Sequence, residues 1–384
     1  MRRIFLSCFL LAAMFTTLNF ASAQQFQPAV YYTASVSNGL IWPVVATDFN
    51  NDGILDLAVG ANATSRISVL LGNGAGTFRS GGSLFTSGLI WMAAGDLNGD
   101  GKADLVVTNF AESGRVFVYF GNGDGTFVPS ASYRASFEPI GIVIADFTGD
   151  GHPDVAVANA NENGPNGEVL VYPNLGNGTL GTAAKYVLPG HPWSLAAGDL
   201  NGDGKLDLAV TKNNTSGANF KNTLSILLNN GDGTFINNVT YSVGIEGTSI
   251  ALADLNHDGK LDLAATYDQE VLVMLGIGDG TFGGGNTYST TTLGQGASSI
   301  VIADFNLDGN PDLAMELANG DPLANTGLLY GIGDGTFQSP PLAVDQFVNG
   351  GNSIVAGDFN HDGAPDLAFG IWAKGKVAVM LNAQ

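Results

Sequence analysis

One nine-residue pattern, Asp-x-Asn-x-Asp-Gly-x-x-Asp, limits what this chain can fold into more than any other feature. Its seven copies lie 48 to 55 residues apart and begin at Asp48, Asp96, Asp146, Asp199, Asp254, Asp304 and Asp358. A period of about 20 to 50 residues is typical of repeat proteins, in which each repeat is one supersecondary unit stacked on its neighbours. The copies extend to the end of the chain, so they leave no room for a separate domain.

The residues between successive copies predict four short strands per repeat. In the second repeat, apolar runs at 92–95 and 105–107 flank the pattern, and further strands are expected at 116–120 and 131–133. A glycine-rich turn, 121–127, separates the last two, and its glycines permit the positive φ angles of a tight hairpin. The turn returns at 72–78, 229–235, 276–282 and 331–337, and in shortened form at 176–180. Four antiparallel strands in about 50 residues make one propeller blade.

The sequence therefore predicts an all-β protein, a seven-bladed β-propeller of four-stranded antiparallel blades. An open solenoid is the competing architecture, and it would need polar caps at both ends. The seventh repeat has no turn and no fourth strand after 377–381, whereas residues 26–32, ahead of the first repeat, resemble a fourth strand. We expect these two segments to pair and to close the ring, which removes the exposed sheet edges.

The first 23 residues predict a secretory signal peptide. Two arginines at the start are followed by the apolar run 4–15 and by the small residues 21–23, a cleavage pattern. The run is shorter than the roughly 20 residues of a membrane-spanning helix, so we expect no membrane insertion after cleavage. Cys8 lies in the signal, and the propeller of residues 24–384 therefore has no disulfide and no thiol nucleophile. We expect export to the periplasm, the cell surface or the medium.

The charge of the chain is one-sided. It holds 35 Asp and Glu against 14 Lys and Arg, a formal net charge of −21. The phosphates of nucleic acids and of anionic membranes would be repelled rather than neutralised, so neither is expected as a partner. We expect instead a monomer that binds a glycan or an extracellular protein.

The nine-residue pattern has the chemistry of a calcium loop. Asp at positions 1, 5 and 9 and Asn at position 3 place four oxygen-bearing side chains on a short loop, and Gly at position 6 allows a sharp bend. Ca²⁺ takes about 6 to 8 oxygen ligands in flexible geometry, whereas Mg²⁺ demands a stricter octahedron. Zinc and copper would prefer nitrogen or sulfur ligands, which the pattern lacks. An EF-hand would need Glu at position 12 and flanking helices, but the first loop has Val59 there and strands on both sides.

The alternative is that these loops are only acidic turns. Against it, the loops hold 21 of the 35 acidic residues, and like charges so close repel unless a cation intervenes. We therefore expect up to seven calcium ions, one per blade, which would stabilise a fold without disulfides. Position 7 would contribute its backbone carbonyl. The predicted ligands are Asp48, Asn50, Asp52, Ile54 and Asp56; Asp96, Asn98, Asp100, Lys102 and Asp104; Asp146, Thr148, Asp150, His152 and Asp154; Asp199, Asn201, Asp203, Lys205 and Asp207; Asp254, Asn256, Asp258, Lys260 and Asp262; Asp304, Asn306, Asp308, Asn310 and Asp312; and Asp358, Asn360, Asp362, Ala364 and Asp366.

The loops and the Gly-x-Gly-Asp-Gly-Thr-Phe turns together resemble the FG-GAP/VCBS repeat family, whose best-known fold is the seven-bladed propeller of integrin α subunits. The resemblance covers the whole chain after the signal. It implies calcium in the loop joining the first and second strands, on a lower face, and ligand contacts on the upper face. Departures are Thr148 in place of Asn, the short turn at 176–180, and seven calcium loops where integrins have fewer. The family also includes fungal lectins and accessory propellers of polysaccharide-degrading enzymes, so kinship implies the fold more firmly than the function.

Four tryptophans are candidates for the upper face. Trp42, Trp91 and Trp193 stand just ahead of the first strand in the first, second and fourth repeats, and Trp372 follows the second strand of the last repeat. Large aromatic side chains often only pack, so these residues are core plugs under the alternative interpretation. The longest connections between second and third strands are expected on the same face, at 159–168, 212–223 and 318–327.

An enzyme is the second functional hypothesis. Three of the four histidines lie in the predicted calcium loops, which leaves His191, close in sequence to Lys185, Tyr186 and Trp193. His and Tyr could abstract a proton from a uronic acid, as in a polysaccharide lyase, although a loop histidine is the simpler interpretation. No phosphate-binding loop, nucleophile elbow or zinc motif is present. The first hypothesis is a non-catalytic, calcium-binding module for adhesion or glycan recognition, and the alternative is a polysaccharide lyase or hydrolase with His191 at its centre.

Overall fold

The computed structural model describes residues 25–34, 41–109, 114–161, 164–213, 223–243, 247–267, 269–293, 296–318, 326–345, 353–371 and 375–383. The predicted signal peptide, Trp372 and most of the predicted long connections lie outside these residues. Within the described ranges the chain is almost entirely strand, with two 3-10 turns at Asn62–Thr64 and Thr291–Leu293. None of the helices in this part of the chain is long and apolar enough to cross a membrane.

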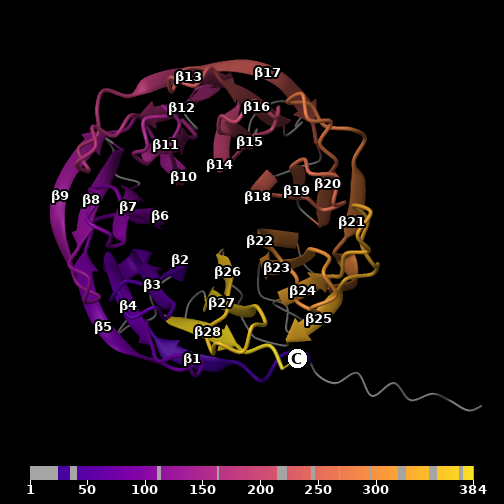
Figure 1. Ribbon diagram of the computed structural model, residues 1–384, viewed down its shortest axis with the longest axis horizontal. Helices are drawn as coiled ribbons and strands as arrows, with labels where there is room; N and C mark the ends of the chain where they lie inside the picture. The colour runs from indigo at the N-terminus through magenta and orange to yellow at the C-terminus, as the bar shows by residue number, and fades with distance from the viewer. Residues whose placement is uncertain are drawn as a thin grey trace, which may run out of the picture.

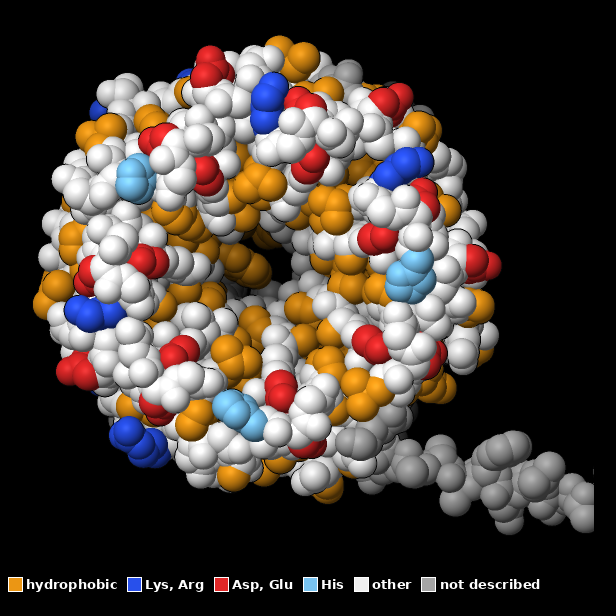
Figure 2. All heavy atoms as spheres, in the orientation of Figure 1, with side chains coloured by type: hydrophobic (Ala, Val, Ile, Leu, Met, Phe, Trp, Pro, Cys, Tyr) orange, Lys and Arg blue, Asp and Glu red, His pale blue; other side chains and the backbone are white. Residues whose placement is uncertain are grey.

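The described residues form twenty-eight strands in seven separate four-stranded antiparallel sheets arranged as a ring (Figure 1), around a central channel that opens on the face seen in Figure 2. We number the sheets as blades in chain order. Blade 1 contains β2 (Ile41–Thr47), β3 (Asp56–Ala61), β4 (Arg66–Gly72) and β5 (Phe78–Phe85); blade 2, β6 (Leu89–Gly95), β7 (Asp104–Asn109), β8 (Arg115–Gly121) and β9 (Phe127–Arg134); blade 3, β10 (Pro139–Ala145), β11 (Asp154–Asn159), β12 (Asn166–Tyr172) and β13 (Ala184–Pro189). Blade 4 contains β14 (His191–Gly198), β15 (Asp207–Asn213), β16 (Thr223–Asn229) and β17 (Phe235–Ser242).

The remaining three blades follow the same order. Blade 5 contains β18 (Gly247–Ala253), β19 (Asp262–Tyr267), β20 (Glu270–Met274) and β21 (Asn286–Ser289); blade 6, β22 (Gly296–Ala303), β23 (Asp312–Ala318), β24 (Thr326–Leu329) and β25 (Leu342–Asp345); blade 7, β26 (Ile354–Gly357), β27 (Asp366–Ile371), β28 (Lys376–Met380) and β1 (Val30–Thr33). The first strand of each blade lines the channel and the fourth forms the outer wall (Figure 1). The predicted fold class is confirmed.

The burial of each strand follows from its place in the blade. The second strands β3, β7, β11, β19 and β27 are buried at every residue, and β15 at all but its last, because neighbouring blades cover both faces of the sheet. The fourth strands alternate between exposed and half-buried residues, as in β9, because they meet solvent on the outside. This difference explains why the sequence of the second strands lacks polar alternation.

Blade 7 is built from both ends of the chain, as the sequence predicted. β1 pairs antiparallel with β28, with Val30 opposite Val379 and Thr33 opposite Lys376. An isolated bridge between Phe26 and Asn382 extends the pairing, and the Phe26 side chain is fully buried. The N-terminal strand therefore closes the ring.

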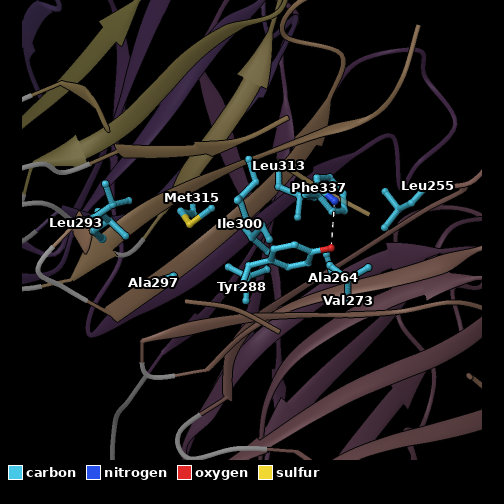
Figure 3. Close-up of a cluster of buried hydrophobic side chains, with 13 residues drawn as sticks. Leu255, Ala264, Val273, Tyr288, Leu293, Ala297, Ile300, Leu313, Met315 and Phe337 are labelled. Carbon is cyan, nitrogen blue, oxygen red and sulfur yellow. Dashed lines mark hydrogen bonds between the residues drawn. The ribbon is translucent and has the colours of Figure 1, made fainter. Parts of the chain in front are cut away.

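Aromatic side chains seal the blades against each other. Tyr288 of β21 points toward Phe337 of the next blade, its Oη accepts the Phe337 backbone N–H at 3.0 Å, and the ring centroids are 5.6 Å apart (Figure 3). The same contact from a fourth-strand tyrosine to the following blade recurs for Tyr133 with Leu180, Tyr186 with Phe235 and Tyr241 with Phe282. The phenylalanine that ends the turn motif, replaced by Leu180 in blade 3, thus packs between its own blade and the preceding one.

Candidate metal centres and ligand face

All seven nine-residue loops lie on one face of the ring, because each joins the first strand of a blade to the second. We call this face the loop face and the opposite one the distal face. The turns between third and fourth strands also lie on the loop face. Acidic side chains are spaced around the central opening on the face seen in Figure 2. The loops are therefore equivalent sites in a ring rather than one shared centre.

The first half of each loop is folded around its own oxygen atoms. In blade 1, Asp48 accepts the backbone N–H groups of Asp52 and Gly53 at 3.2 and 2.7 Å, and Asp52 Oδ1 accepts that of Ile54 at 2.9 Å. Asn50 Oδ1 accepts the Asp52 N–H at 3.0 Å. The glycine at position 6 has φ between +79° and +90° in every loop, a conformation that a side chain would strain.

Position 9 plays a different part from positions 1 and 5. The side chain is fully buried in all seven loops, at Asp56, Asp104, Asp154, Asp207, Asp262, Asp312 and Asp366. In blade 1, Asp56 Oδ2 accepts the Phe49 N–H at 2.9 Å and Oδ1 accepts the Gly72 N–H at 2.8 Å, and the same pair of bonds recurs in the other blades. This carboxylate ties the loop to the start of the turn in its own blade.

Burial raises the pKa of the position-9 carboxyls. The pKa is raised to about 6 for Asp56, Asp312 and Asp366, because desolvation outweighs the backbone N–H groups that favour the charged form. The neighbouring loop carboxylates raise the pKa of Asp56 further. The direction is the same for Asp104, Asp154, Asp207 and Asp262. Each loop thus holds a buried carboxyl whose charged form its surroundings disfavour and a bound cation would stabilise.

The residues of the loop fit a calcium ion by the chemistry of their donors. Positions 1, 3 and 5 supply carboxylate and amide oxygens, and a carboxylate oxygen that accepts one N–H keeps a lone pair for a cation. In the described ranges, no group of three or more Asp, Glu, His or Cys side chains is arranged to hold a metal by itself. An ion held here would also need amide and backbone carbonyl oxygens as ligands.

The third loop departs from the others as its sequence suggested. Thr148 stands at position 3, and its buried hydroxyl has no hydrogen-bond partner, whereas Asn in the other loops accepts a backbone N–H.

In three loops the side chain of the lysine at position 7 forms an ion pair with the position-5 aspartate. The distances are 3.3 to 3.5 Å in the pairs Lys102–Asp100, Lys205–Asp203 and Lys260–Asp258. These exposed pairs neutralise the loops only weakly.

Two substitutions in the loop of blade 1 should distinguish the structural role of the aspartate at position 9 from that of the aspartate at position 5. In the absence of calcium, Asp56→Ala is expected to lower the free energy of unfolding by about 2–4 kcal/mol, because two buried N–H groups lose their acceptor and the loss of a buried charge offsets part of that cost. Asp52→Ala, on the exposed side of the same loop, should cost less than about 1 kcal/mol. Urea unfolding of both variants in EGTA measures the difference. Equal losses would show that Asp56 does not anchor the turn.

The carbonyl at position 2 of each loop joins neighbouring blades, a role that the sequence did not reveal. The Gly125 N–H of blade 2 donates to Phe49 O of blade 1 at 3.0 Å, and the Gly76 N–H of blade 1 donates to Phe359 O of blade 7 at 3.0 Å. Blades 4, 5 and 6 repeat this contact through Gly233, Gly280 and Gly335. In blades 3 and 7 an asparagine amide replaces it, Asn174 to Leu97 O and Asn382 to Phe305 O, both at 2.7 Å. The seven loops are thus linked around the whole ring.

The distal face brings together two of the four predicted tryptophans. Trp91 and Trp193 are half-buried and both pack against a small apolar cluster of Ile90, Ile140 and Ala160. Both side chains are therefore packed in part against the apolar interior, as expected if these tryptophans only fill the core. The backbone of Trp42 lies in β2, but its side chain, like all of Trp372, lies outside the described residues.

His191, Lys185 and Tyr186, which the alternative enzyme hypothesis would bring together, do not converge in the structure. His191 is 3% exposed, and its Nδ1 lies 2.7 Å from the carbonyl oxygen of Ala160. Lys185 forms an ion pair with Glu168. Tyr186 Oη donates to Gly233 O and accepts the Phe235 N–H, both of which belong to a loop-face turn. The imidazole is a buried structural group, and the phenol points to the other end of the ring.

The chain matches the FG-GAP-like repeat at residues 48–107, 96–157, 146–210, 215–265 and 254–315. These matches cover more than half of the sequence, and the chain belongs to the FG-GAP-like repeat family. The resemblance drawn from the loops and turns is confirmed.

Several curated proteins are similar over part of the chain. Integrin alpha-4 of Xenopus laevis is 34% identical over 140 residues, 31% of this chain and 14% of the integrin. Phosphatidylinositol-glycan-specific phospholipase D of Rattus norvegicus is 29% identical over 154 residues, 31% of this chain and 18% of that protein. Cartilage acidic protein 1 of Xenopus tropicalis is 25% identical over 268 residues, 67% of this chain and 39% of that protein. The chain spans less than half the length of each of these relatives.

Solved structures share the fold. A lectin of Agrocybe aegerita that recognises non-reducing terminal N-acetylglucosamine has a TM-score of 0.54 at 23% identity, over 88% of this chain and 85% of the lectin. BBS1N, solved in complex with ARL6DN, has a TM-score of 0.61 at 12% identity, over 93% of this chain and 98% of that chain. At these identities the likeness establishes the propeller architecture alone.

Proposed function

We propose that this protein is an exported, calcium-stabilised propeller that binds a glycan or an extracellular protein on its distal face without catalysing a reaction. The observation that carries the proposal is the linked ring of loops. Seven sets of oxygen donors lie at equivalent joints between blades, where a cation neutralises the clustered carboxylates. Such joints make a rigid platform, and loops held on a rigid platform commonly carry binding sites.

The relatives support a binding role. An integrin α subunit and a lectin share the repeat or the fold. On the distal face, Trp91 and Trp193 offer half-buried aromatic surface, the kind of group that stacks on sugar rings or on a partner's apolar side chains. His191, Lys185 and Tyr186 have separate partners, so their arrangement does not support a lyase centre at His191.

A binding screen tests the proposal. The protein that begins at Gln24 is applied to glycan and extracellular-protein arrays in calcium, and hits are measured by titration. We expect Trp91→Ala and Trp193→Ala to weaken the binding by about 10-fold or more, and Leu175→Ala, a 65% exposed residue on the loop face, to leave it unchanged. Release of unsaturated uronate or of new reducing ends, lost in His191→Ala, would instead establish the enzyme.

A further inference from the structure

Four cations on the distal rim of blades 7, 1 and 2 form no ion pair with an acidic side chain that the structure describes. Arg66, Arg115 and Lys376 are the first residues of the third strands β4, β8 and β28, and Arg134 lies directly opposite Arg115 on β9. Third strands begin at the distal face, so these residues form one arc of its outer rim, which we name the basic arc. The ion pairs of the described residues involve other cations, namely Lys102, Lys185, Lys205 and Lys260.

The basic arc is confined to three consecutive blades. The residues at the same strand position in blades 3 to 6 are neutral or acidic, namely Asn166, Thr223, Glu270 and Thr326. A seven-fold repeat would place similar residues at all seven positions if they only supported the fold. At this strand position the positive charge is therefore concentrated in three blades, which points to a local role.

The side chains of the basic arc are held without being neutralised. Arg115 Nη1 donates to Ser132 Oγ at 3.2 Å, and Arg66 Nη1 is 3.5 Å from Ser83 Oγ in the matching place of blade 1. Each guanidinium has five N–H donors, so most remain open to solvent. Arg115 and Arg134 face each other across the strand pair, an arrangement of like charges that costs stability.

The acidic face of the protein does not cancel this charge. The loop carboxylates lie at the other end of six-residue second strands, about 20 Å away at the usual rise of about 3.3 Å per residue. The Debye length at physiological ionic strength is about 8 Å, so their field at the distal rim is largely screened. The loop carboxylates therefore contribute little to the potential at the basic arc, and the described acidic residue close to it in sequence is Glu138, four residues after Arg134.

Exposed aromatic rings accompany the cations. Phe85 lies directly opposite Arg66 and is 71% exposed, and Phe137, three residues after Arg134, is 56% exposed. Aromatic rings beside guanidinium groups suit a ligand that combines an apolar ring face with carboxylate or sulfate groups.

We propose that the basic arc binds a single chain of an anionic polysaccharide, carboxylated or sulfated. A flexible chain contacts only the rim, whereas duplex DNA or a membrane would also approach the acidic remainder of the surface and be repelled. The inference rests on the proposed function in placing the glycan on the distal side, and it names the class of glycan and the blades that hold it.

The test compares two triple variants of the calcium-loaded protein. Binding to hyaluronan and to dextran sulfate is measured by surface plasmon resonance, with neutral dextran as the reference and at rising salt. Arg66→Gln combined with Arg115→Gln and Arg134→Gln should weaken binding to at least one anionic chain by about 10-fold or more and flatten its salt dependence. The control combines Leu175→Glu, Ile277→Glu and Ile332→Glu, exposed residues of loop-face turns outside the calcium loops, which shifts the net charge by the same three units and should change binding by less than about two-fold.

The outcomes separate this inference from the proposed function. Equal losses in both triple variants would mean non-specific attraction and would overturn the basic arc. So would equal, arc-dependent binding to duplex DNA or to phosphatidylserine vesicles, since the ligand would not be a polysaccharide. Binding confined to neutral glycans or to a protein would contradict the basic arc and leave the proposed function standing, whereas a blank result on every array would remove the proposed function as well.

Discussion

Removal of calcium with EGTA is expected to lower the midpoint of thermal unfolding by about 5–15 °C. Sites with dissociation constants of about 10⁻⁴ to 10⁻³ M each stabilise the fold by about 0.6–1.8 kcal/mol at about 2 mM calcium. Seven such sites give about 5–12 kcal/mol, and a chain of this size loses its structure with a large unfolding entropy, which converts that sum into the stated shift. Calorimetry in calcium and in EGTA measures it, with magnesium as the control ion.

The pH dependence of the same measurement sharpens the test. The pKa of the position-9 carboxyls is raised to about 6 at Asp56, Asp312 and Asp366, above that of an unfolded aspartate. The calcium-free fold therefore binds more protons than the unfolded chain, and its stability should increase as the pH falls from 7 to 5. The calcium increment should shrink over the same range, because protons compete with the ion. A calcium-free midpoint that falls toward pH 5 would contradict the raised pKa values, and a midpoint that calcium does not raise at pH 7 would contradict the proposed calcium sites.

Deletion of residues 24–34 is expected to cost about 5 kcal/mol or more and to make unfolding less cooperative. The deletion removes β1, exposes the edge of β28 and empties the place of the fully buried Phe26. Phe26→Ala alone should cost about 3–5 kcal/mol, whereas Val30→Ala, which is 47% exposed on the outer wall, should cost less than about 1 kcal/mol. Urea unfolding followed by circular dichroism gives all three values.

A peptide of residues 24–34 provides the control for the deletion. Added in trans, it should restore part of the lost stability in proportion to its concentration, because it binds only the folded ring. A scrambled peptide should have no effect. A deleted protein that unfolds at the same denaturant concentration as the full chain would show that the ring does not depend on this strand.

The repeat made most of the fold predictable. The spacing of the aspartate loops gave seven units, and the missing fourth strand of the last unit identified β1 as its replacement. Strand ends were less predictable, since bulges near the distal ends of the first strands, as between Leu89 and Trp91, shift the pairing register without any sign in the apolar pattern.

The oxygen-rich character of the loops was predictable from the sequence, but the different roles of the individual aspartates were not. Three aspartates at fixed spacing indicate an oxygen-rich loop, yet spacing alone does not distinguish Asp52, exposed on the loop, from Asp56, bound to two backbone N–H groups. The interblade bond to Phe49 O is equally hidden, because a backbone carbonyl has no side-chain signal. His191 was ambiguous for a similar reason, as only the fold shows that its partner is a buried carbonyl.

Both described ends of the chain leave the ring at one place. Phe26 and Asn382 are bridged, and Gln25 and Asn382 both donate to the loop carbonyl of Phe305, so the two ends emerge on the loop face of blade 7. A carrier domain or a surface anchor joined to either end would hold the propeller by that side. The opposite side, with its tryptophans and arginines, would then be presented outward, which makes a fusion at either terminus a natural way to display this protein for capture experiments.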